Sequence, residues 1–282
     1  MYEVSTATKD VETENVTRAL PFFMDEFVMF GDSITQFAWQ AGGTGSDLAN
    51  FYQRRLDVVN RGYSGYNTTW ALEVAKTIFS ASSTAVSQRQ PKKLIVTIWL
   101  GANDSVLPNR AQHVSPSDFT KNLTELISMI RNHDRSTSNS SLTRQTQIIL
   151  ITPPPISVEM RAIDCASRFP DWKPENMDRE PGRTRQFAQL VCQVALQESL
   201  PVVDAWTSIT KLAALDPEKG LSKYLIDGLH LTPAGYKVVT TELKNLITEH
   251  LPSLLPENLK NPFPWWAEID PLDPSKSFPD YH

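Results

Sequence analysis

Cysteine is scarce in this chain of 282 residues, which carries only Cys165 and Cys192. Two cysteines cannot build a disulfide framework, and neither lies in a C-x-x-C or Cys/His pattern of the kind that binds zinc. We interpret both as buried or incidental thiols, and the sequence predicts no metal site.

Long apolar runs and an excess of basic residues are also missing. No stretch approaches the 18 consecutive apolar residues of a membrane span, and residues 1–20 lack the basic and apolar regions of a signal peptide. The 27 Lys and Arg are outnumbered by 32 Asp and Glu, so no basic surface for nucleic acid is expected. We therefore expect a cytoplasmic protein with no membrane span and no nucleic-acid partner.

Five short apolar runs do recur along the chain, and longer stretches separate them. Their richness in Val and Ile, without alternation, is typical of strands covered on both faces, as in a parallel sheet. The stretches between them are long enough for the crossovers that parallel strands need. The runs are Phe27–Phe30, Leu56–Val59, Leu94–Leu100, Ile148–Thr152 and Pro201–Ala205.

Three of the stretches that follow these runs show helical spacing of apolar residues, namely Phe119–Ile130, Phe187–Val194 and Tyr236–Ile247. Thr232 and Pro233 supply an N-cap and a first-turn proline for the third. Strands that alternate with helices predict an α/β fold, an open parallel sheet with helices on both faces. In such a sheet the functional site lies beyond the carboxyl ends of the strands.

The sequence divides into a polar N-terminal extension (1–24), a main domain (25–251) and a tail rich in proline and aromatic residues (252–282). Within the main domain, residues 153–183 are interpreted as a long loop with a short helix. The tail carries Phe263, Trp265, Trp266 and Phe278, whose exposure a soluble monomer would avoid. The tail is expected to cover the rim of the active site, to pack in a homodimer, or to run along its own domain.

Ser33 directly follows the first predicted strand, in the segment Phe30-Gly31-Asp32-Ser33. A serine there can raise its hydroxyl out of the sheet at the start of a helix, although serine at a helix start is commonly just an N-cap. The G-x-S-x-G pentapeptide of the α/β-hydrolases is absent, so their nucleophile elbow is not predicted.

Two further loops can supply hydrogen-bond donors. Asn103 follows the third strand, where its amide can face a developing negative charge, or can simply form a turn. Gly62 and Gly65 follow the second strand, where a backbone N–H can serve the same purpose, or the glycines can mark an ordinary turn.

Asp227 and His230 stand just before the last predicted helix. A carboxylate three residues before a histidine can orient the imidazole and stabilise its charged form. A metal site would need further ligands, which the sequence does not cluster there. Together these loops supply a nucleophile, a base, an orienting acid and oxyanion donors, which is the set that acyl transfer needs.

The motifs Gly31-Asp32-Ser33, Gly65, Gly101-x-Asn103-Asp104 and Asp227-x-x-His230 resemble, in order, the four blocks of the GDSL or SGNH hydrolases. The segments FGDSIT, RGYSGYNTTWAL, LGANDS and DGLHLTPAGY are most similar to the branch of isoamyl acetate-hydrolysing esterases. The first motif reads GDSI rather than GDSL, and Ile34 is a near-isosteric replacement for that leucine.

This resemblance implies a flavodoxin-like three-layer α/β/α sandwich around a five-stranded parallel sheet. It implies a catalytic group of Ser33 as nucleophile, His230 as base and Asp227 as its partner. The implied oxyanion hole comprises Ser33, Asn103 and Gly65, with Gly65 favoured over Gly62 by its spacing from the strand. No cofactor is implied, because positioned hydrogen bonds and one base suffice.

The substrate is expected to be a small carboxylic ester with a short acyl chain. The expected pocket walls are mostly apolar and comprise Ile34, Phe37, Trp39, Val106 and Leu107 together with residues 153–183. A carbohydrate acetylesterase, a thioesterase or a lysophospholipase would use the same machinery. A protein that kept the fold without catalysis is the alternative from another class.

Overall fold

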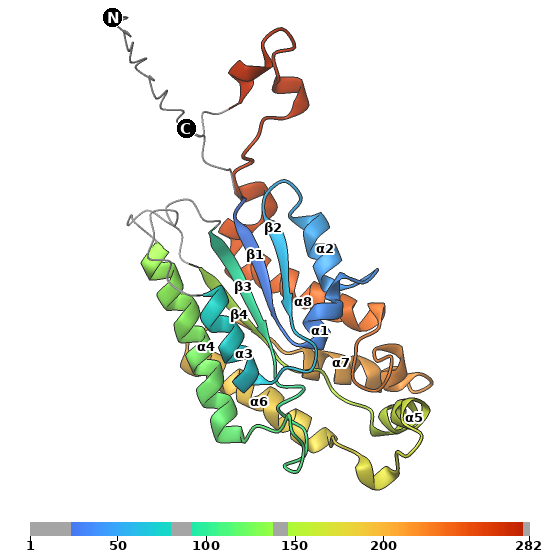
Figure 1. Ribbon diagram of the computed structural model, residues 1–282. Coiled ribbons are helices and arrows are strands. Elements are labelled where there is room, and N and C mark those ends of the chain that lie inside the picture. Colours follow the sequence, from blue (N-terminus) through green and yellow to red (C-terminus); the bar gives the residue numbers. More distant parts are fainter. Residues whose placement is uncertain (1–23, 80–91, 138–145, 279–282) are drawn as a thin grey trace, which may run out of the picture. The chain divides into compact units, whose positions relative to one another are not determined.

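A five-stranded sheet forms the core of residues 24–262, and its strands are all parallel (Figure 1). The computed structural model describes residues 24–79, 92–137 and 146–278. The strand order is β2-β1-β3-β4-β5, which is the flavodoxin-like order. The strands are β1 (Glu26–Gly31), β2 (Asp57–Gly62), β3 (Lys93–Trp99), β4 (Gln147–Ile151) and β5 (Val202–Val203). Each overlaps one of the five apolar runs, so the predicted strands are confirmed.

Helices cover both faces of this sheet, because the side chains of each strand alternate between two cores. Phe27 and Met29 of β1 point into one hydrophobic core, and Val28 and Phe30 point into the other. The first core is closed by α1 (Ser33–Gln36), α2 (Thr44–Phe51), α7 (Ala205–Ala214) and α8 (Pro233–His250). The second is closed by α3 (Thr68–Ile78), α4 (Pro116–Thr137) and α6 (Pro181–Gln197). The three-layer α/β/α sandwich is confirmed.

The three predicted helices are present as α4, α6 and α8. Thr232 caps α8 by accepting a hydrogen bond from the backbone N–H of Gly235 at 3.2 Å, and Pro233 occupies its first turn. The cap and the proline therefore act as the sequence predicts.

The connection between β4 and α6 is more ordered than a long loop. It contains α5 (Val158–Arg168), a helix of 11 residues, and a short 3₁₀ helix (Pro174–Asn176), and α6 already begins at Pro181. Cys165 is the only buried residue of α5. The segment carries Glu159, Arg161, Asp164 and Arg168 among few large apolar residues, and so polar a composition predicts a loop with a shorter helix than the structure has.

The hydrophobic core continues beyond α8. Leu254 and Leu259, in the turns that follow the helix, are buried in the same core as α8. Residues 263–278 belong to a second compact unit, with 3₁₀ helices at Trp266–Glu268 and Pro274–Ser277. Inside that unit the rings of Phe263 and Phe278 lie 6.3 Å apart. The expected role of the tail stays a prediction, and most of the N-terminal extension lies outside the described residues.

The helices that the structure describes include none whose length and apolar character would let it cross a bilayer.

Candidate active site

Ser33 lies at the carboxyl end of β1, as the first residue of α1. The N-cap of this helix is Asp32, whose Oδ1 accepts a hydrogen bond from the backbone N–H of Ile34 at 2.9 Å. The hydroxyl of Ser33 is therefore not needed as a cap, which was the alternative interpretation of a serine at this position.

The Ser33 hydroxyl instead meets His230, 197 residues further along the chain. Ser33 Oγ lies 2.9 Å from His230 Nε2, and His230 Nδ1 lies 2.7 Å from Asp227 Oδ2. A carboxylate only accepts hydrogen bonds, so Nδ1 carries the proton and Nε2 of the neutral ring accepts one from the serine. Three residues that the sequence singles out thus form one continuous line of hydrogen bonds.

The backbone that follows Asp227 holds its carboxylate in place. Asp227 Oδ1 accepts hydrogen bonds from the N–H groups of Leu229 at 3.0 Å and His230 at 2.8 Å. Partial burial alone would raise the pKa of this carboxyl, but the hydrogen bonds from the side chain and backbone of His230 outweigh it and lower the pKa. Asp227 therefore stays ionised at neutral pH.

Gly228 packs this loop against the start of α5. Its φ is +81°, and a Cβ added there would lie 2.4 Å from the carbonyl oxygen of Ser157. The N–H of Ser157 donates to the carbonyl of Gly228 at 2.9 Å. Only glycine fits this position, both for its backbone angle and for the close contact.

The loop after β2 turns back at Gly65. The N–H of Tyr66 donates to the carbonyl of Tyr63 at 3.1 Å, and Gly65, the third residue of this turn, has a φ of +82°, as a type II turn requires. Gly62 differs, because its N–H donates to Asn60 Oδ1 at 2.8 Å. Of the two glycines, Gly62 thus has its N–H already engaged.

Asn103, in the loop after β3, links this turn to the rest of the site. Its side chain is buried, at 3% exposure, and Nδ2 donates to the carbonyl of Tyr66 at 2.9 Å. Its Oδ1 accepts a hydrogen bond from Arg179 Nη2 at 3.0 Å. The loops after β1, β2 and β3 therefore meet at one edge of the sheet, as the parallel topology predicts.

The residues expected to line a pocket fall into two groups. The Phe37 ring packs edge-on against the His230 ring, with centroids 5.3 Å apart, and Trp39 and Leu107 are half-buried. Ile34 and Val106 have no exposed surface. Ile34, on α1, packs in the first hydrophobic core, and Val106 is buried in the loop after β3, so neither presents surface to an open pocket.

Comparison with known proteins agrees with this geometry. The sequence profile of the GDSL-like lipase/acylhydrolase family matches residues 29–238. The chain belongs to this family. A GDSL esterase/lipase of Arabidopsis thaliana is 36% identical over 90% of this chain and 97% of its own length. An isoamyl acetate-hydrolyzing esterase 1 homolog of Bos taurus is 34% identical over 94% of this chain and 96% of its own length.

Solved structures of GDSL-type proteins share the fold. A lipase/acylhydrolase from Enterococcus faecalis superposes with a TM-score of 0.53 at 22% identity, over 84% of this chain and 98% of that one. Because the sequence shows that the chain belongs to the GDSL family, the chain is an ester hydrolase.

Two buried carboxyl groups beside the site were not singled out from the sequence as titrating groups. Burial raises the pKa of Asp32 to about 7 and that of Asp104 to about 6. Asp104 Oδ1 accepts hydrogen bonds from the N–H and the hydroxyl of Thr68, at 2.8 and 2.6 Å, and so anchors the start of α3. Both residues lie inside the recognised motifs, but the sequence pattern carries no measure of how deeply they are buried.

We expect Asp32 to make the esterase less stable as the pH rises. The folded protein holds this proton up to a pKa of about 7, against 3.8 for the ordinary group, so the free energy of unfolding falls between about pH 4 and pH 7. Over this pH range the free energy of unfolding falls by about 4 kcal/mol, at roughly 1.4 kcal/mol for each unit by which the pKa is raised. Asp32→Asn keeps an oxygen for the cap, and its loss of stability from about pH 5.5 to pH 8 should be smaller than that of the wild type by about 2 kcal/mol.

Urea unfolding at the two pH values measures this difference. Asp57→Asn, at the exposed start of β2, is the matched control and should follow the wild type. An Asp32→Asn protein with the same pH dependence as the wild type would contradict the expectation.

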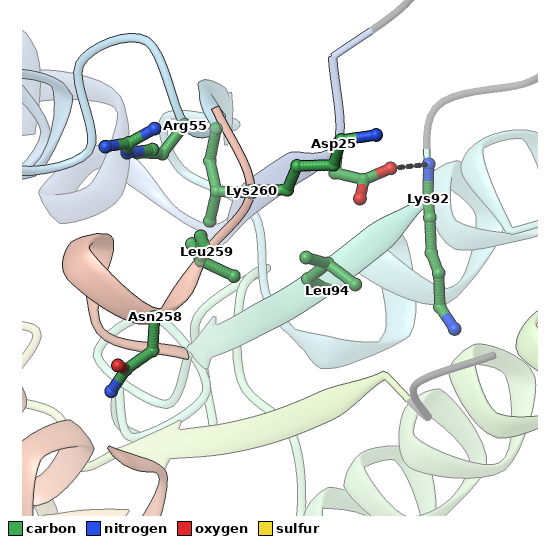
Figure 2. A pocket seen from close by; sticks show the side chains of 8 residues that line it. Asp25, Arg55, Lys92, Leu94, Asn258, Leu259 and Lys260 are labelled. Carbon is green, nitrogen blue, oxygen red and sulfur yellow. Dashed lines mark hydrogen bonds between the residues drawn. The ribbon is translucent and has the colours of Figure 1, made fainter. Parts of the chain in front are cut away.

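A hollow of about 480 Å³ lies at the opposite end of the strands from Ser33, at their amino ends (Figure 2). Asp25 and Leu94, at the amino ends of β1 and β3, line it together with Leu259 and Lys260. Active sites of such sheets lie at the carboxyl ends of the strands, so this hollow is separate from the Ser33 site.

Among the described residues, no three His, Cys, Asp or Glu side chains come together as a metal site would need.

Proposed function

We propose that this protein is a serine esterase that hydrolyses short-chain, acetate-type carboxylic esters through an acyl-enzyme intermediate. The observation that carries the proposal is the line of hydrogen bonds from Asp227 through His230 to Ser33, at 2.7 and 2.9 Å. A hydroxyl in this arrangement can lose its proton to the imidazole as it attacks a carbonyl carbon.

In the first half of the reaction, Ser33 Oγ bonds to the ester carbon while its proton passes to His230 Nε2. The tetrahedral intermediate then collapses, and His230 gives that proton to the departing alcohol, which leaves an acyl group on Ser33. In the second half, water attacks the acyl carbon and gives a proton to His230, and the bond from that carbon to Ser33 Oγ then breaks, which releases the carboxylic acid as His230 returns the proton to Oγ. Asp227 remains ionised throughout because its pKa is lowered. No metal or organic cofactor is needed for these steps.

The oxyanion hole is proposed to consist of the N–H groups of Ser33 and Gly65 and the side-chain amide of Asn103. Gly65 is preferred to Gly62, because the N–H of Gly62 is bound to Asn60 Oδ1. The amide nitrogen of Asn103 has two hydrogens, and the carbonyl of Tyr66 takes one of them. The second hydrogen is proposed to bind the negative charge that develops on the substrate oxygen.

The proposed class of aliphatic, acetate-type esters rests on two observations. Phe37 places an aromatic ring against the proposed base, and the half-buried Trp39 and Leu107 add apolar surface. Several relatives of similar length are named isoamyl acetate-hydrolyzing esterase homologs, and we carry that ester class to this chain as part of the proposal. A carbohydrate acetylesterase, a thioesterase and a lysophospholipase would share the same catalytic group.

Hydrolysis of p-nitrophenyl acetate, butyrate and palmitate by the purified protein tests this function. We expect kcat/KM to be highest for acetate or butyrate and lowest for palmitate, with Ser33→Ala as the background control. A preference for palmitate would favour a lysophospholipase-like enzyme, and activity restricted to acetylated sugars would favour a carbohydrate acetylesterase. Absence of Ser33-dependent hydrolysis of all three esters and of acetylated sugars, thioesters and lysophospholipids would overturn the proposed function.

A further inference from the structure

Arg179 is a buried cation that none of the recognised motifs contains. It lies in the connection between β4 and α6, and its side chain is only 3% exposed. A buried guanidinium is costly unless acceptors surround it. The acceptors that Arg179 contacts therefore indicate what the residue does.

Two of these acceptors belong to the loop after β3. Arg179 Nη1 donates to the carbonyl of Ala102, and Nη2 donates to Asn103 Oδ1 at 3.0 Å. The carbonyl of Ala102 belongs to the peptide that enters Asn103, so the planar guanidinium holds both the backbone and the side chain of that residue. Two parallel hydrogen bonds from one rigid group fix an orientation better than one bond does.

This contact also determines which way round the Asn103 amide lies. A guanidinium has donors and no acceptor, so the amide must turn its oxygen towards Arg179. On the other side, Asn103 Nδ2 faces the carbonyl of Tyr66, which can only accept. The amide nitrogen is thereby held at the carboxyl edge of β3, on the side of the turn that contains Gly65.

Arg179 is itself held by its neighbours. The N–H of Leu107 donates to the carbonyl of Asp178 at 2.9 Å, and Asp178 Oδ2 lies 3.7 Å from Arg179 Nε. Arg110 Nη2 donates to the carbonyl of Asn176 at 2.7 Å. Residues 176–179 are thus bound to the loop after β3 at several points, and the guanidinium has a fixed base from which to act.

We propose that Arg179 is a positioning residue for the oxyanion hole: it orients the Asn103 amide so that its N–H faces the reacting carbonyl. The inference rests on the proposed function, since it assigns a role to Asn103 in that reaction. Arg179 makes its hydrogen bonds to Ala102 and Asn103 rather than to Ser33, and in this proposal it acts through Asn103.

A double-mutant cycle of Arg179→Met and Asn103→Ala tests this role, with kcat and KM measured on the best p-nitrophenyl ester. Loss of one oxyanion donor costs roughly 10²–10³ in kcat, so we expect that loss for Asn103→Ala. Misorientation should cost less, so we expect a fall in kcat of about 10- to 100-fold for Arg179→Met with little change in KM. In the Asn103→Ala background, Arg179→Met should change kcat by no more than about 3-fold, because the group it orients is gone.

Arg183→Met is the matched control. Arg183 lies four residues away and donates to the carbonyl of Ser105 at 3.1 Å, in the same loop, without contacting Asn103. We expect both arginine variants to lower Tm and only Arg179→Met to lower kcat. Arg179→Lys keeps the charge but has a single donor nitrogen in place of the planar fork, and its kcat should lie between those of the wild type and Arg179→Met. If Arg179→Met does not fold, Arg179→Lys in the same cycle supplies the test.

Three results would overturn the role of Arg179: a kcat within about 2-fold of the wild type, a rise in KM alone, or effects of the two substitutions that multiply in the double variant. An equal fall in kcat for Arg183→Met would show a merely structural effect and overturn it too. Full activity of Ser33→Ala would instead refute the proposed function. The Ser33 variant therefore tests the proposed function, and the arginine variants test the role of Arg179.

Discussion

Ser33→Ala should lower kcat by on the order of 10⁵- to 10⁶-fold, and His230→Ala should do nearly the same. When two residues act together in catalysis, removing either one abolishes most of the rate enhancement that the pair provides. The 2.9 Å contact between Ser33 Oγ and His230 Nε2 makes these two such a unit. The remaining rate over that in water should come from the oxyanion donors alone.

Steady-state rates on p-nitrophenyl butyrate, with mass spectrometry after treatment with a fluorophosphonate, measure this effect. The covalent adduct should map to Ser33 and be absent from Ser33→Ala. Ser167→Ala, on the exposed side of α5, is the control and should keep its rate and its label. Activity of Ser33→Ala within tenfold of the wild type would exclude the serine mechanism.

Asp227→Asn is expected to lower kcat by roughly 10³- to 10⁴-fold while leaving the fold in place. The asparagine oxygen can still accept the backbone hydrogen bonds of Leu229 and His230, so the loop keeps its shape. Its amide nitrogen would face His230 Nδ1 as a donor. The imidazole must then carry its proton on Nε2, where it cannot accept one from Ser33.

Asp216→Asn is the matched control for this substitution. Asp216 is a carboxylate paired with Lys223, at 3.1 Å, and it makes no contact with the histidine. Kinetics of the two variants, together with circular dichroism spectra, separate a catalytic effect from a loss of structure. A kcat for Asp227→Asn within about tenfold of the wild type would remove Asp227 from the mechanism.

The sheet could be predicted from the sequence because parallel strands are buried on both faces and therefore appear as uninterrupted apolar runs. Even β5, which has only two residues, is visible within the run Pro201–Ala205. The length of helix α5 is not predicted for the opposite reason, since most of its residues are at least partly exposed and its composition is polar. An element with little buried surface needs few apolar residues, so its composition resembles that of a loop.

The proposed catalytic residues could be found because each one follows a strand or precedes a helix within a short motif. Arg179 could not, because its partners Ala102 and Asn103 are more than 75 residues away in sequence and no local pattern marks a buried arginine. The same holds for the contact of Gly228 with Ser157, which arises only when α5 folds against the histidine loop. Long-range packing of this kind depends on the tertiary structure rather than on neighbouring residues.

The hydrogen bonds of Asp227 have a consequence for motion within the site. All three of those that hold His230 and its loop fall within four consecutive residues, whereas the bond to Ser33 crosses between distant parts of the chain. Fluctuations of this loop, on the nanosecond-to-microsecond timescale of loops, would carry the acid and the base together as one rigid unit. The proposed acid and base would then keep their relative geometry, and the separation of Ser33 Oγ from His230 Nε2 is the distance that such motion would change.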